Sequence, residues 1–399
     1  MLLFSCQLLK WAFAILDPVP VMNHHFPLPQ GGELVLHRYP KFTDHGLQAW
    51  EAADEYLIQQ LGTLAWDDSA PLIIVNDAFG ALTLALHRYR PCTIFDSRVS
   101  ELALEHNARD NHITADWQSL NSLDDWPQAP GLVLFKLPKI NAMLEHQLAC
   151  LSQVMGPETR VIAGAKARDV HSSTLKLFER YIGPTHTSLA WKKARLIFAE
   201  PDMGKAPSPV PAIQSWPLEG TELTIHNLAN VFSRGSLDVG ARFMLEHIPA
   251  GRPDRIIDLG CGNGVLGLVA LARNPQARVT FVDESYMAVA SARHNVGDNL
   301  PDALSRAQFM VNNCLEGMGP EDADLVLCNP PFHQQQAITD HIAWQMFVDA
   351  KRVLRRGGEL LLVANRHLDY HQKLKRLFGN QRVVASNRKF VILRAIKNA

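Results

Sequence analysis

The sequence lacks the cysteine spacing of disulfide-linked or zinc-binding proteins. Its six cysteines are scattered along 399 residues, and no two of them form a Cys-x-x-Cys pair. Six scattered cysteines in a chain of this length do not suggest a disulfide framework, and without a Cys-x-x-Cys pair they do not suggest a zinc knuckle. We therefore expect a protein of the reducing cytoplasm that binds no metal.

A membrane-spanning segment is also missing. The apolar opening, residues 1–16, is interrupted by Lys10 and is shorter than the roughly 20 residues that cross a bilayer. It has neither the basic leader nor the small-residue cleavage site of a signal peptide. Amphipathic, globular-looking sequence begins only after Met22, so we expect residues 1–21 to be a non-native or disordered extension.

Neither sign of charge is in excess over the whole chain, but charge is strongly segregated within it. The formal net charge is −1, yet residues 22–135 carry 6 Lys and Arg against 15 Asp and Glu. Residues 136–195 carry 10 against 4, and residues 351–399 carry 13 against 2. A solvated surface would explain either basic run alone, whereas two such runs in separate parts of the chain favour one footprint for a polyanion.

A proline-rich stretch divides the chain. Prolines occupy positions 201, 207, 209, 211 and 217, and little apolar periodicity remains between them. Such a stretch is stiff and extended, so we expect a linker at 201–217 between domains at 22–200 and 218–399.

The two halves repeat one pattern. Short apolar runs alternate with longer helical patterns in both, which is typical of parallel sheets covered on both faces. A His-Asn pair also recurs, at 106–107 and at 294–295. The sequence therefore predicts two tandem Rossmann-like α/β domains that arose by duplication. The segments that align are 71–82 with 255–266, 92–97 with 279–284, 131–139 with 324–332, and 160–166 with 360–366.

A glycine-rich loop follows the predicted strand 256–258 of the second half. Gly260, Gly262 and Gly264 allow a sharp turn and a close approach of the backbone to a ligand. The next helix then points the positive end of its dipole at an anionic group of that ligand. The spacing also satisfies the dinucleotide fingerprint with Asp283 as its acid, so the loop alone leaves both a nicotinamide cofactor and S-adenosylmethionine open.

Four further residues have places suited to S-adenosylmethionine. Asp258 ends the first strand and can accept a hydrogen bond from the methionine ammonium, directly or through water. Asp283 ends the next strand and can take both ribose hydroxyls, and Asn313 follows the third strand, where an amide meets the adenine edge. Phe232 precedes the first strand and is expected to cover the cofactor.

The tetrad Asn329-Pro330-Pro331-Phe332 decides between the two cofactors, because a dehydrogenase has no use for it. An aryl amine is a poor nucleophile, since its lone pair is delocalised into the ring. Asn329 offers a side-chain carbonyl and Pro330 a main-chain carbonyl to its two N–H groups. Phe332 would stack on the base, worth about 1–3 kcal/mol. The sequence therefore predicts methylation of an exocyclic or amide nitrogen.

The acceptor stays open on these residues alone. The same tetrad serves adenine-N6 methyltransferases and enzymes that methylate a protein glutamine, and a protein that only scaffolds rRNA is the alternative from another class. Phenylalanine at 332, the duplicated fold and the two basic runs favour guanine in RNA. The first half has Lys136 and Lys139 in place of Asn329 and Phe332, so we expect chemistry only in the second half.

From about residue 33 onward the sequence resembles the ribosomal RNA guanine-N2 methyltransferases with a duplicated methyltransferase fold. The resemblance rests on segment 230–242, the glycine loop and segment 329–336. Segments 47–56 and 163–169 place it nearer the branch that acts on 23S rRNA than the sister branch that acts on 16S rRNA. It implies two class I methyltransferase domains, S-adenosylmethionine as donor, and a degenerate N-terminal domain that helps to hold RNA.

Structured RNA is held largely through its phosphates and its shape, which suits Lys and Arg distributed over two domains. We expect the N-terminal basic run to contribute to this contact, in a chain that acts as a monomer and has no membrane partner. The expected RNA-binding residues are Lys136, Lys139, Lys166, Arg168, Lys192, Lys193 and Arg195.

Overall fold

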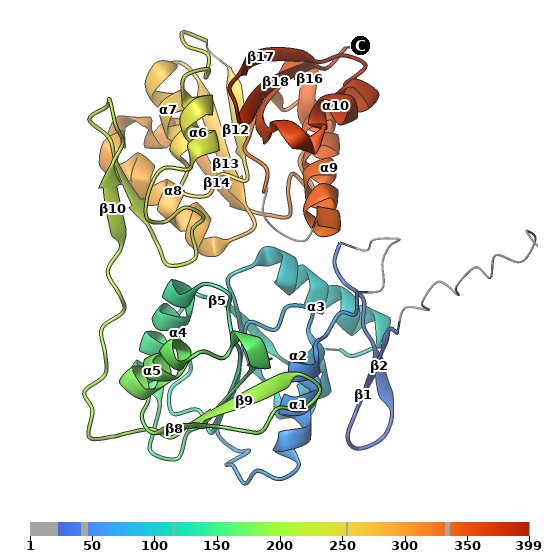
Figure 1. The fold of residues 1–399 in the computed structure, drawn as a ribbon, viewed down its shortest axis with the longest axis vertical. Coiled ribbons are helices and arrows are strands. Elements are labelled where there is room, and N and C mark those ends of the chain that lie inside the picture. Colours follow the sequence, from blue (N-terminus) through green and yellow to red (C-terminus); the bar gives the residue numbers. More distant parts are fainter. Residues whose placement is uncertain (1–22, 41–46, 115, 253, 332–335, 399) are drawn as a thin grey trace, which may run out of the picture.

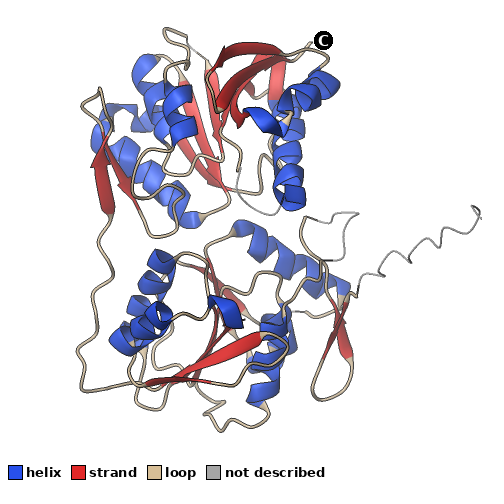
Figure 2. Cartoon of the chain, viewed as in Figure 1, coloured by secondary structure: helices blue, strands red, loops and turns tan. Residues whose placement is uncertain are grey.

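The computed structural model describes residues 23–40, 47–114, 116–252, 254–331 and 336–398, with only the backbone for 336–340. The predictions about residues 1–21 and about the start at Met22 lie outside these ranges. Figure 1 shows two domains, one above the other, joined along one side by an extended segment. Each domain is a sheet with helices on both of its faces (Figure 2).

The C-terminal domain contains a seven-stranded sheet in the order β14-β13-β12-β15-β16-β18-β17. The first five strands in this order are parallel, and β18 is antiparallel to both of its neighbours. The strands are β12 (Arg255–Leu259), β13 (Arg278–Asp283), β14 (Ala307–Val311), β15 (Ala323–Cys328), β16 (Leu354–Asn365), β17 (Arg382–Ser386) and β18 (Phe390–Ile396). The helices are α6 (Val239–Leu245), α7 (Val265–Arg273), α8 (Tyr286–Asn299), α9 (Gln336–Val353) and α10 (Tyr370–Phe378), with short 3₁₀ turns η3 (Pro301–Arg306) and η4 (Arg366–Leu368).

The N-terminal domain repeats this topology strand for strand, in the order β5-β4-β3-β6-β7-β9-β8. Its strands are β3 (Leu72–Val75), β4 (Cys92–Phe95), β5 (Gln118–Asn121), β6 (Leu132–Lys136), β7 (Arg160–Lys166), β8 (Thr185–Thr187) and β9 (Ala194–Ala199). Its helices are α1 (Ala52–Leu61), α2 (Ala81–Ala85), α3 (Arg98–Asp110), α4 (Asn141–Val154) and α5 (Ser172–Tyr181), with 3₁₀ turns η1 (His87–Tyr89) and η2 (Ala167–Asp169). The prediction of two tandem Rossmann-like domains is confirmed.

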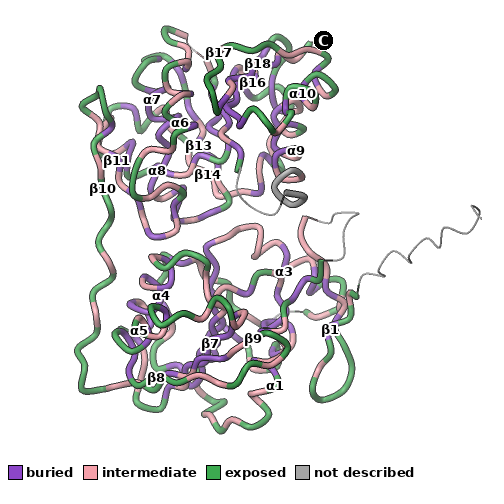
Figure 3. Tube along the Cα trace, in the orientation of Figure 1, coloured by how far each residue is buried: buried purple, intermediate pink, exposed green. Residues whose placement is uncertain are grey.

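The strands at the centre of both sheets are buried on each face, as their continuous apolar runs predict (Figure 3). In the C-terminal domain, alternate residues of β12 enter opposite cores. Ile256 packs with α6 and α7, and Ile257 packs with α9. None of the helices in the described ranges is both long and apolar enough to cross a membrane.

A two-stranded hairpin precedes each sheet and is pinned by asparagines. The hairpins are β1 (His25–Pro27) with β2 (Glu33–Val35), and β10 (Gln214–Pro217) with β11 (Thr224–Asn227). Asn295 of α8 donates to the carbonyl of His226 at 3.0 Å and accepts from its N–H at 2.7 Å. Asn107 of α3 makes the same two bonds to His37, two residues after the end of β2, both at 2.9 Å. The repeated His-Asn pair therefore marks a repeated pin between helix and hairpin.

The register of the strands shifts two of the predicted alignments by one residue each. Val75 pairs with Ile94 in the first sheet, and the aligned Leu259 pairs with Val282 in the second. Phe95 therefore takes the place of Asp283, and Asp96 takes that of Glu284. The alignment of 92–97 with 279–284 was wrong by one position. It matched Asp96 with Asp283 because each of these aspartates follows a similar apolar run. The segment 160–166 shifts in the same way: Lys166 and Asn365 both precede a 3₁₀ turn.

The extended connection between the domains is shorter than the predicted linker. The range 201–217 includes β10, which pairs with β11 from Gln214 to Pro217. Pro217 is tolerated because it ends a strand that has a neighbour on one side only. Residues 200–213 contain no helix or strand and join β9 to β10.

Candidate active site

The carboxyl ends of the two parallel sheets face each other. The backbone after β4 pairs with the backbone after β13: Arg98 donates to the carbonyl of Glu284 at 2.8 Å, and Tyr286 donates to that of Asp96 at 3.0 Å. Open α/β sheets bind ligands at the carboxyl edge. The candidate site of the C-terminal domain therefore lies at its border with the N-terminal domain (Figure 1).

The glycine loop joins β12 to α7 through three left-handed residues. The φ angles of Gly260, Gly262 and Gly264 are 69°, 55° and 77°, which residues with a β-carbon rarely adopt. A β-carbon on Gly264 would lie 2.7 Å from that of Ala292, so this end of the loop packs against α8. A β-carbon on Gly262 would meet no described atom within 4 Å, so this backbone borders open space.

Asp258 presents an unpaired carboxylate oxygen at the start of the loop. Its side chain is 1 % exposed, and Oδ2 accepts from the N–H of Gly267 at 2.8 Å. Among the described residues, Oδ1 has no hydrogen-bond partner. Burial, and less strongly the charge of Asp283, raises the pKa of Asp258 to about 7. A buried oxygen of this kind fits a cationic donor such as the methionine ammonium of S-adenosylmethionine.

Asp283 ends β13 and ties the glycine loop to α8. Its carboxylate accepts from the N–H of Gly262 at 2.9 Å and from that of Ser285 at 3.0 Å. Desolvation raises the pKa of Asp283. The backbone N–H of Glu284 also acts on this carboxylate. A carboxylate has about four acceptor sites, so it keeps some capacity for the ribose hydroxyls expected there.

Asn313 lies at a cavity of about 370 Å³ that both domains line. Its Nδ2 donates to Glu316 at 3.1 Å, and its Oδ1 accepts from Gln345 at 3.3 Å. The hydroxyl of Tyr39, from the N-terminal domain, donates to the same Glu316 at 3.0 Å. The N-terminal domain therefore reaches the place expected for adenine. The cavity is lined by Tyr39, Pro40, Asn313, Glu316, Gly317, Gln345, Asp349 and Arg352.

Asn329 follows β15 and presents its amide with a fixed orientation. Its Nδ2 donates to Oδ2 of Asp238 at 3.2 Å. Its Oδ1 is buried and has no hydrogen-bond partner within the described part of the chain. Pro330 is buried beside it, and Phe332 lies outside the described residues. Asp238 also caps α6 by accepting from the N–H of Ala241 at 2.8 Å, so its position is set by the helix.

Phe232 lies between two anchored ends of segment 230–238. At one end, Asn230 donates to Asp96 of the N-terminal domain at 2.6 Å. At the other end, Asp238 holds Asn329. The ring of Phe232 is 56 % exposed, so it is accessible to a ligand at this border.

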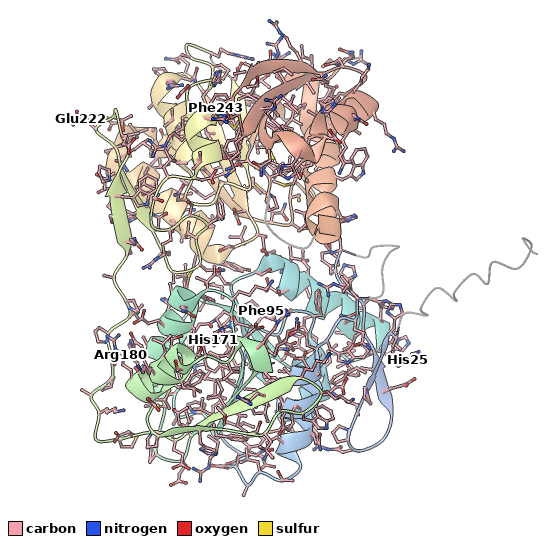
Figure 4. The ribbon with its side chains drawn as sticks, viewed as in Figure 1. His25, Phe95, His171, Arg180, Glu222 and Phe243 are labelled. Carbon is pink, nitrogen blue, oxygen red and sulfur yellow. The ribbon has the colours of Figure 1, made fainter. Side chains whose placement is uncertain are left out.

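The equivalent positions of the N-terminal domain carry different chemistry. Phe95, labelled in Figure 4, is buried where the C-terminal domain has Asp283. Lys136 stands where the C-terminal domain has Asn329, and it pairs with Asp54 at 2.7 Å. A phenyl ring cannot bind ribose hydroxyls, and an ammonium cannot accept from an amino group. The N-terminal domain therefore has the same fold but lacks the counterparts of Asp283 and Asn329.

Four of the seven expected RNA-binding residues lie beside the carboxylates of α1 or of its N-cap residue, Glu51. Three of the lysines pair with these carboxylates: Lys136 with Asp54, Lys166 with Glu51 at 2.8 Å, and Lys192 with Glu55 at 2.7 Å. Lys139 acts on the pKa of Glu51 as well, and Arg168 lies 3.6 Å from Asp169. Lys193 is exposed, and Arg195 is half-buried. RNA binding by this set stays a prediction.

Sequence reasoning missed two residues at the site. It did not place Asp238 there, whereas the structure shows its carboxylate accepting a hydrogen bond from Asn329. It also missed Asn295, whose Nδ2 donates to the carbonyl of Asn263 in the glycine loop at 2.8 Å. The repeated His-Asn pair was the available signal for the second residue, since a polar pair kept in both halves indicates a shared structural bond.

Two family models together match most of the chain. The RLMG N-terminal domain matches residues 24–203, and the methyltransferase small domain matches residues 222–394. The ribosomal RNA large subunit methyltransferase G of Aeromonas salmonicida (strain A449) is 59% identical over 367 residues, which cover 91% of this chain and 97% of that protein. The protein of the same name from Aeromonas hydrophila subsp. hydrophila is 58% identical over 373 residues, with the same coverage.

The chain belongs to the ribosomal RNA large subunit methyltransferase G family. Membership confirms the predicted class of S-adenosylmethionine-dependent methyltransferase. A solved structure, the Thermus thermophilus 16S rRNA N2 G1207 methyltransferase (RsmC) in complex with AdoMet and guanosine, aligns with a TM-score of 0.74. It covers 94% of this chain and 98% of its own, at 23% identity, and so it supports the tandem fold.

Proposed function

We propose that this methyltransferase G family member transfers a methyl group from S-adenosylmethionine to N2 of a guanine in 23S ribosomal RNA. The observation that carries the proposal is the buried, unpaired Oδ1 of Asn329 at the carboxyl edge of a sheet whose glycine loop presents a second unpaired oxygen on Asp258. In this proposal residues 218–399 form the catalytic domain, residues 22–200 the degenerate RNA-binding domain, and residues 201–217 the linker.

The relatives support the large-subunit substrate. Both Aeromonas proteins are named for the large subunit, and they align over nearly their whole length. The T. thermophilus structure, named for guanine N2 of 16S rRNA, supports the same nitrogen on the other subunit. Methylation of 16S rRNA or of a protein glutamine amide remains the alternative. Because the proposed substrate is ribosomal RNA, we propose that the reaction takes place in the cytoplasm.

The cofactor contacts follow from the unpaired groups of the loop. Asp258 Oδ1 would accept from the methionine ammonium, Asp283 from the ribose hydroxyls, and Asn313 would meet the adenine edge. The backbone at Gly262 borders this space without a β-carbon in the way, Gly260 and Gly264 give the loop its left-handed turns, and Phe232 would cover the cofactor. When bound, S-adenosylmethionine supplies a methyl group on a positively charged sulfur.

The chain itself contributes acceptors and position to the transfer. Asn329 Oδ1 would accept one N–H of the guanine amino group and the Pro330 carbonyl the other, which draws the nitrogen toward tetrahedral geometry. Phe332 would stack on the base. No strong base is required, because the proton leaves after the nitrogen has gained positive charge. Catalysis is then mostly in-line positioning with fixed dipoles.

A guanine that is paired or stacked in folded RNA must leave its stack to reach Asn329. The site lies at the border of the two domains, so the N-terminal domain is placed to hold the flanking RNA. Its lysines are partly neutralised by α1, which limits the charge available for phosphates and favours recognition of shape.

The decisive experiment is transfer of labelled methyl from S-adenosylmethionine to unmodified large-subunit and small-subunit rRNA separately, with mass spectrometry of the nucleosides. N2-methylguanosine in the large-subunit RNA alone is the expected result. The same nucleoside in small-subunit RNA alone would keep the mechanism and overturn the substrate. No label in either RNA, naked or in assembled subunits, but label in a protein glutamine would overturn RNA as the acceptor.

A further inference from the structure

The contact between the two domains is symmetric. Asp96 and Glu284 are equivalent, and so are Ser97 and Ser285, the N-cap residues of α3 and α8. The hydroxyl of Ser285 donates to Asp96 at 2.6 Å, and that of Ser97 donates to Glu284. Each domain thus places a carboxylate at the first turn of the other domain's helix, where the helix dipole favours negative charge.

The symmetry is broken by the additional bonds of Asp96. Its Oδ1 accepts from the N–H of Met287 in α8 at 3.1 Å, and its Oδ2 accepts from Nδ2 of Asn230 at 2.6 Å as well as from Ser285. Its side chain is only 6 % exposed. Asn230 begins the segment that contains Phe232 and ends at Asp238. One carboxylate of the N-terminal domain therefore holds two elements of the candidate site in the C-terminal domain.

A continuous path of hydrogen bonds leads from Asp96 to the glycine loop. Ser285 is held on both sides, because its hydroxyl donates to Asp96 and its N–H donates to Asp283 at 3.0 Å. Asp283 in turn accepts from Gly262 at 2.9 Å. The position of the Asp283 carboxylate relative to the loop thus depends on where Asp96 fixes Ser285.

We propose that Asp96, in the domain without a cofactor loop, is a positioning residue for S-adenosylmethionine in the other domain. It acts through Ser285 on Asp283 and through Asn230 on the segment that carries Phe232. The inference rests on the proposed role of Asp283 toward the ribose. It assigns the N-terminal domain a part in cofactor binding in addition to any contact with RNA.

The test is calorimetry of the full chain with S-adenosylmethionine and the variant Asp96→Asn. The amide keeps the size of the side chain but loses one acceptor for three donors, so we expect affinity to fall roughly five- to tenfold. Selectivity provides the readout that general destabilisation would not change. Wild type should prefer S-adenosylhomocysteine to its 2′-deoxy counterpart, and Asp96→Asn should show a smaller preference, because Asp283 is no longer held.

Two control variants separate this role from stability. Asp77→Asn alters another buried carboxylate of the same domain, one that accepts from the N–H of Thr83 at 2.8 Å and makes no described bond to the other domain. Burial raises the pKa of Asp77 and that of Asp96 alike to about 6. Tyr286→Phe removes a bond of 2.9 Å to Glu101 across the same interface. Both controls should bind S-adenosylmethionine within about twofold of wild type.

Each outcome has one meaning. If wild type binds no S-adenosylmethionine, the proposed function fails and the inference fails with it. If wild type binds and Asp96→Asn binds equally well with the same ribose selectivity, only the inference fails, and equal losses in Asp77→Asn would overturn it too. Should Asp96→Asn not fold, Asn230→Ala removes a single donor to Asp96. It is expected to weaken binding about threefold, and unchanged binding would overturn the proposal.

Discussion

At the scale of single residues, the two ends of the Asn329 amide have different partners. The Nδ2 end is bound to Asp238, and the Oδ1 end is buried without a partner among the described residues. A carboxylate can only accept, so Asp238 determines which end of the amide points away from it. In this orientation the amide oxygen of Asn329 is the end that can accept a hydrogen bond from the amino group to be methylated.

Asn329→Ala should reduce turnover by more than about tenfold while S-adenosylmethionine affinity stays within about twofold of wild type. The reason is that Asn329 acts on the acceptor nitrogen and not on the cofactor. Single-turnover methylation of rRNA measures the first quantity, and calorimetry measures the second. An equal loss in cofactor binding would show that Asn329 has been misplaced.

Asp238→Ser should lower turnover about fivefold or more with little change in melting temperature. Serine is a good N-cap for α6, so the helix is kept. Its side chain is too short to hold Asn329, so the amide becomes free to turn. Asp238→Ala is the matched variant, because it loses both the cap and the orientation. Equal turnover in Asp238→Ser and wild type would remove Asp238 from the site.

S-adenosylmethionine affinity should fall about tenfold between about pH 8 and about pH 6, because protonation of Asp258 near pH 7 removes the acceptor for the ammonium. The raised pKa also means that ionisation of Asp258 opposes folding of the unliganded chain as the pH rises from about 4 to about 7. Calorimetry at a series of pH values measures the affinity. Asp258→Asn should bind weakly with no dependence on pH in this range.

The sequence predicted the site at this scale where function requires a particular residue type. The glycine loop, the acids at 258 and 283 and the tetrad after β15 were all visible as motifs. Asp238 was not, because an aspartate at a helix N-cap has a complete structural explanation. Its second bond, to Asn329, depends on β15 lying beside α6, which only the tertiary structure shows.

At the scale of elements, the two asparagine pins offer a comparison within one molecule. Asn295 joins α8 to the β10–β11 hairpin and to the carbonyl of Asn263 in the cofactor loop. Asn107 joins α3 to His37 after the β1–β2 hairpin and to the carbonyl of Phe79, at 2.8 Å, in the loop without cofactor residues. The bonds are alike, but only one of the loops is expected to bind a ligand.

We expect the free energy of unfolding to fall by about 2 kcal/mol or more in each of the variants Asn295→Ala and Asn107→Ala, because several buried backbone groups lose their hydrogen-bond partners. Only Asn295→Ala should also weaken S-adenosylmethionine binding, since it releases the glycine loop. Thermal unfolding and calorimetry of the pair measure both effects. Loss of cofactor affinity in Asn107→Ala to the same extent would contradict the assignment of the second loop.

Element order was predictable because short apolar runs alternate with helical patterns in both halves. Residue-by-residue equivalence was not. Asp96 and Asp283 follow similar apolar runs, and only the pairing of β4 with β3 and of β13 with β12 shows that Phe95 is the counterpart of Asp283. Strand register depends on contacts between distant segments, which a short local alignment does not contain.

At the scale of the whole molecule, fewer of the positive charges in the basic run 136–195 are available to bind a polyanion than the sequence indicated. The net excess of residues 136–195 is offset by α1, which belongs to the acidic stretch 22–135 and lies against the same sheet. Charge segregation along the chain therefore does not imply segregation in space. Folding brings opposite runs together, and a count along the sequence cannot show this.

Lys193→Glu should weaken rRNA binding and reduce the magnitude of its salt slope by about one or more. Lys193 is exposed and has no ion pair within the described part of the chain, so its charge is available to phosphate. Lys176→Glu on α5 changes an exposed lysine outside the expected set and is the matched control. Filter binding over a range of salt concentrations measures both, and an unchanged slope in Lys193→Glu would refute this part of the footprint.

The symmetric contact between the domains does not depend on the concentration of the protein. Two separate copies of one domain could form such a contact, but they would come apart as their concentration fell. Residues 200–213 tether the two halves here, which makes the contact intramolecular and so independent of protein concentration. Whatever support Asp96 gives to the cofactor loop is therefore the same in a cell that holds few molecules of the enzyme as in one that holds many.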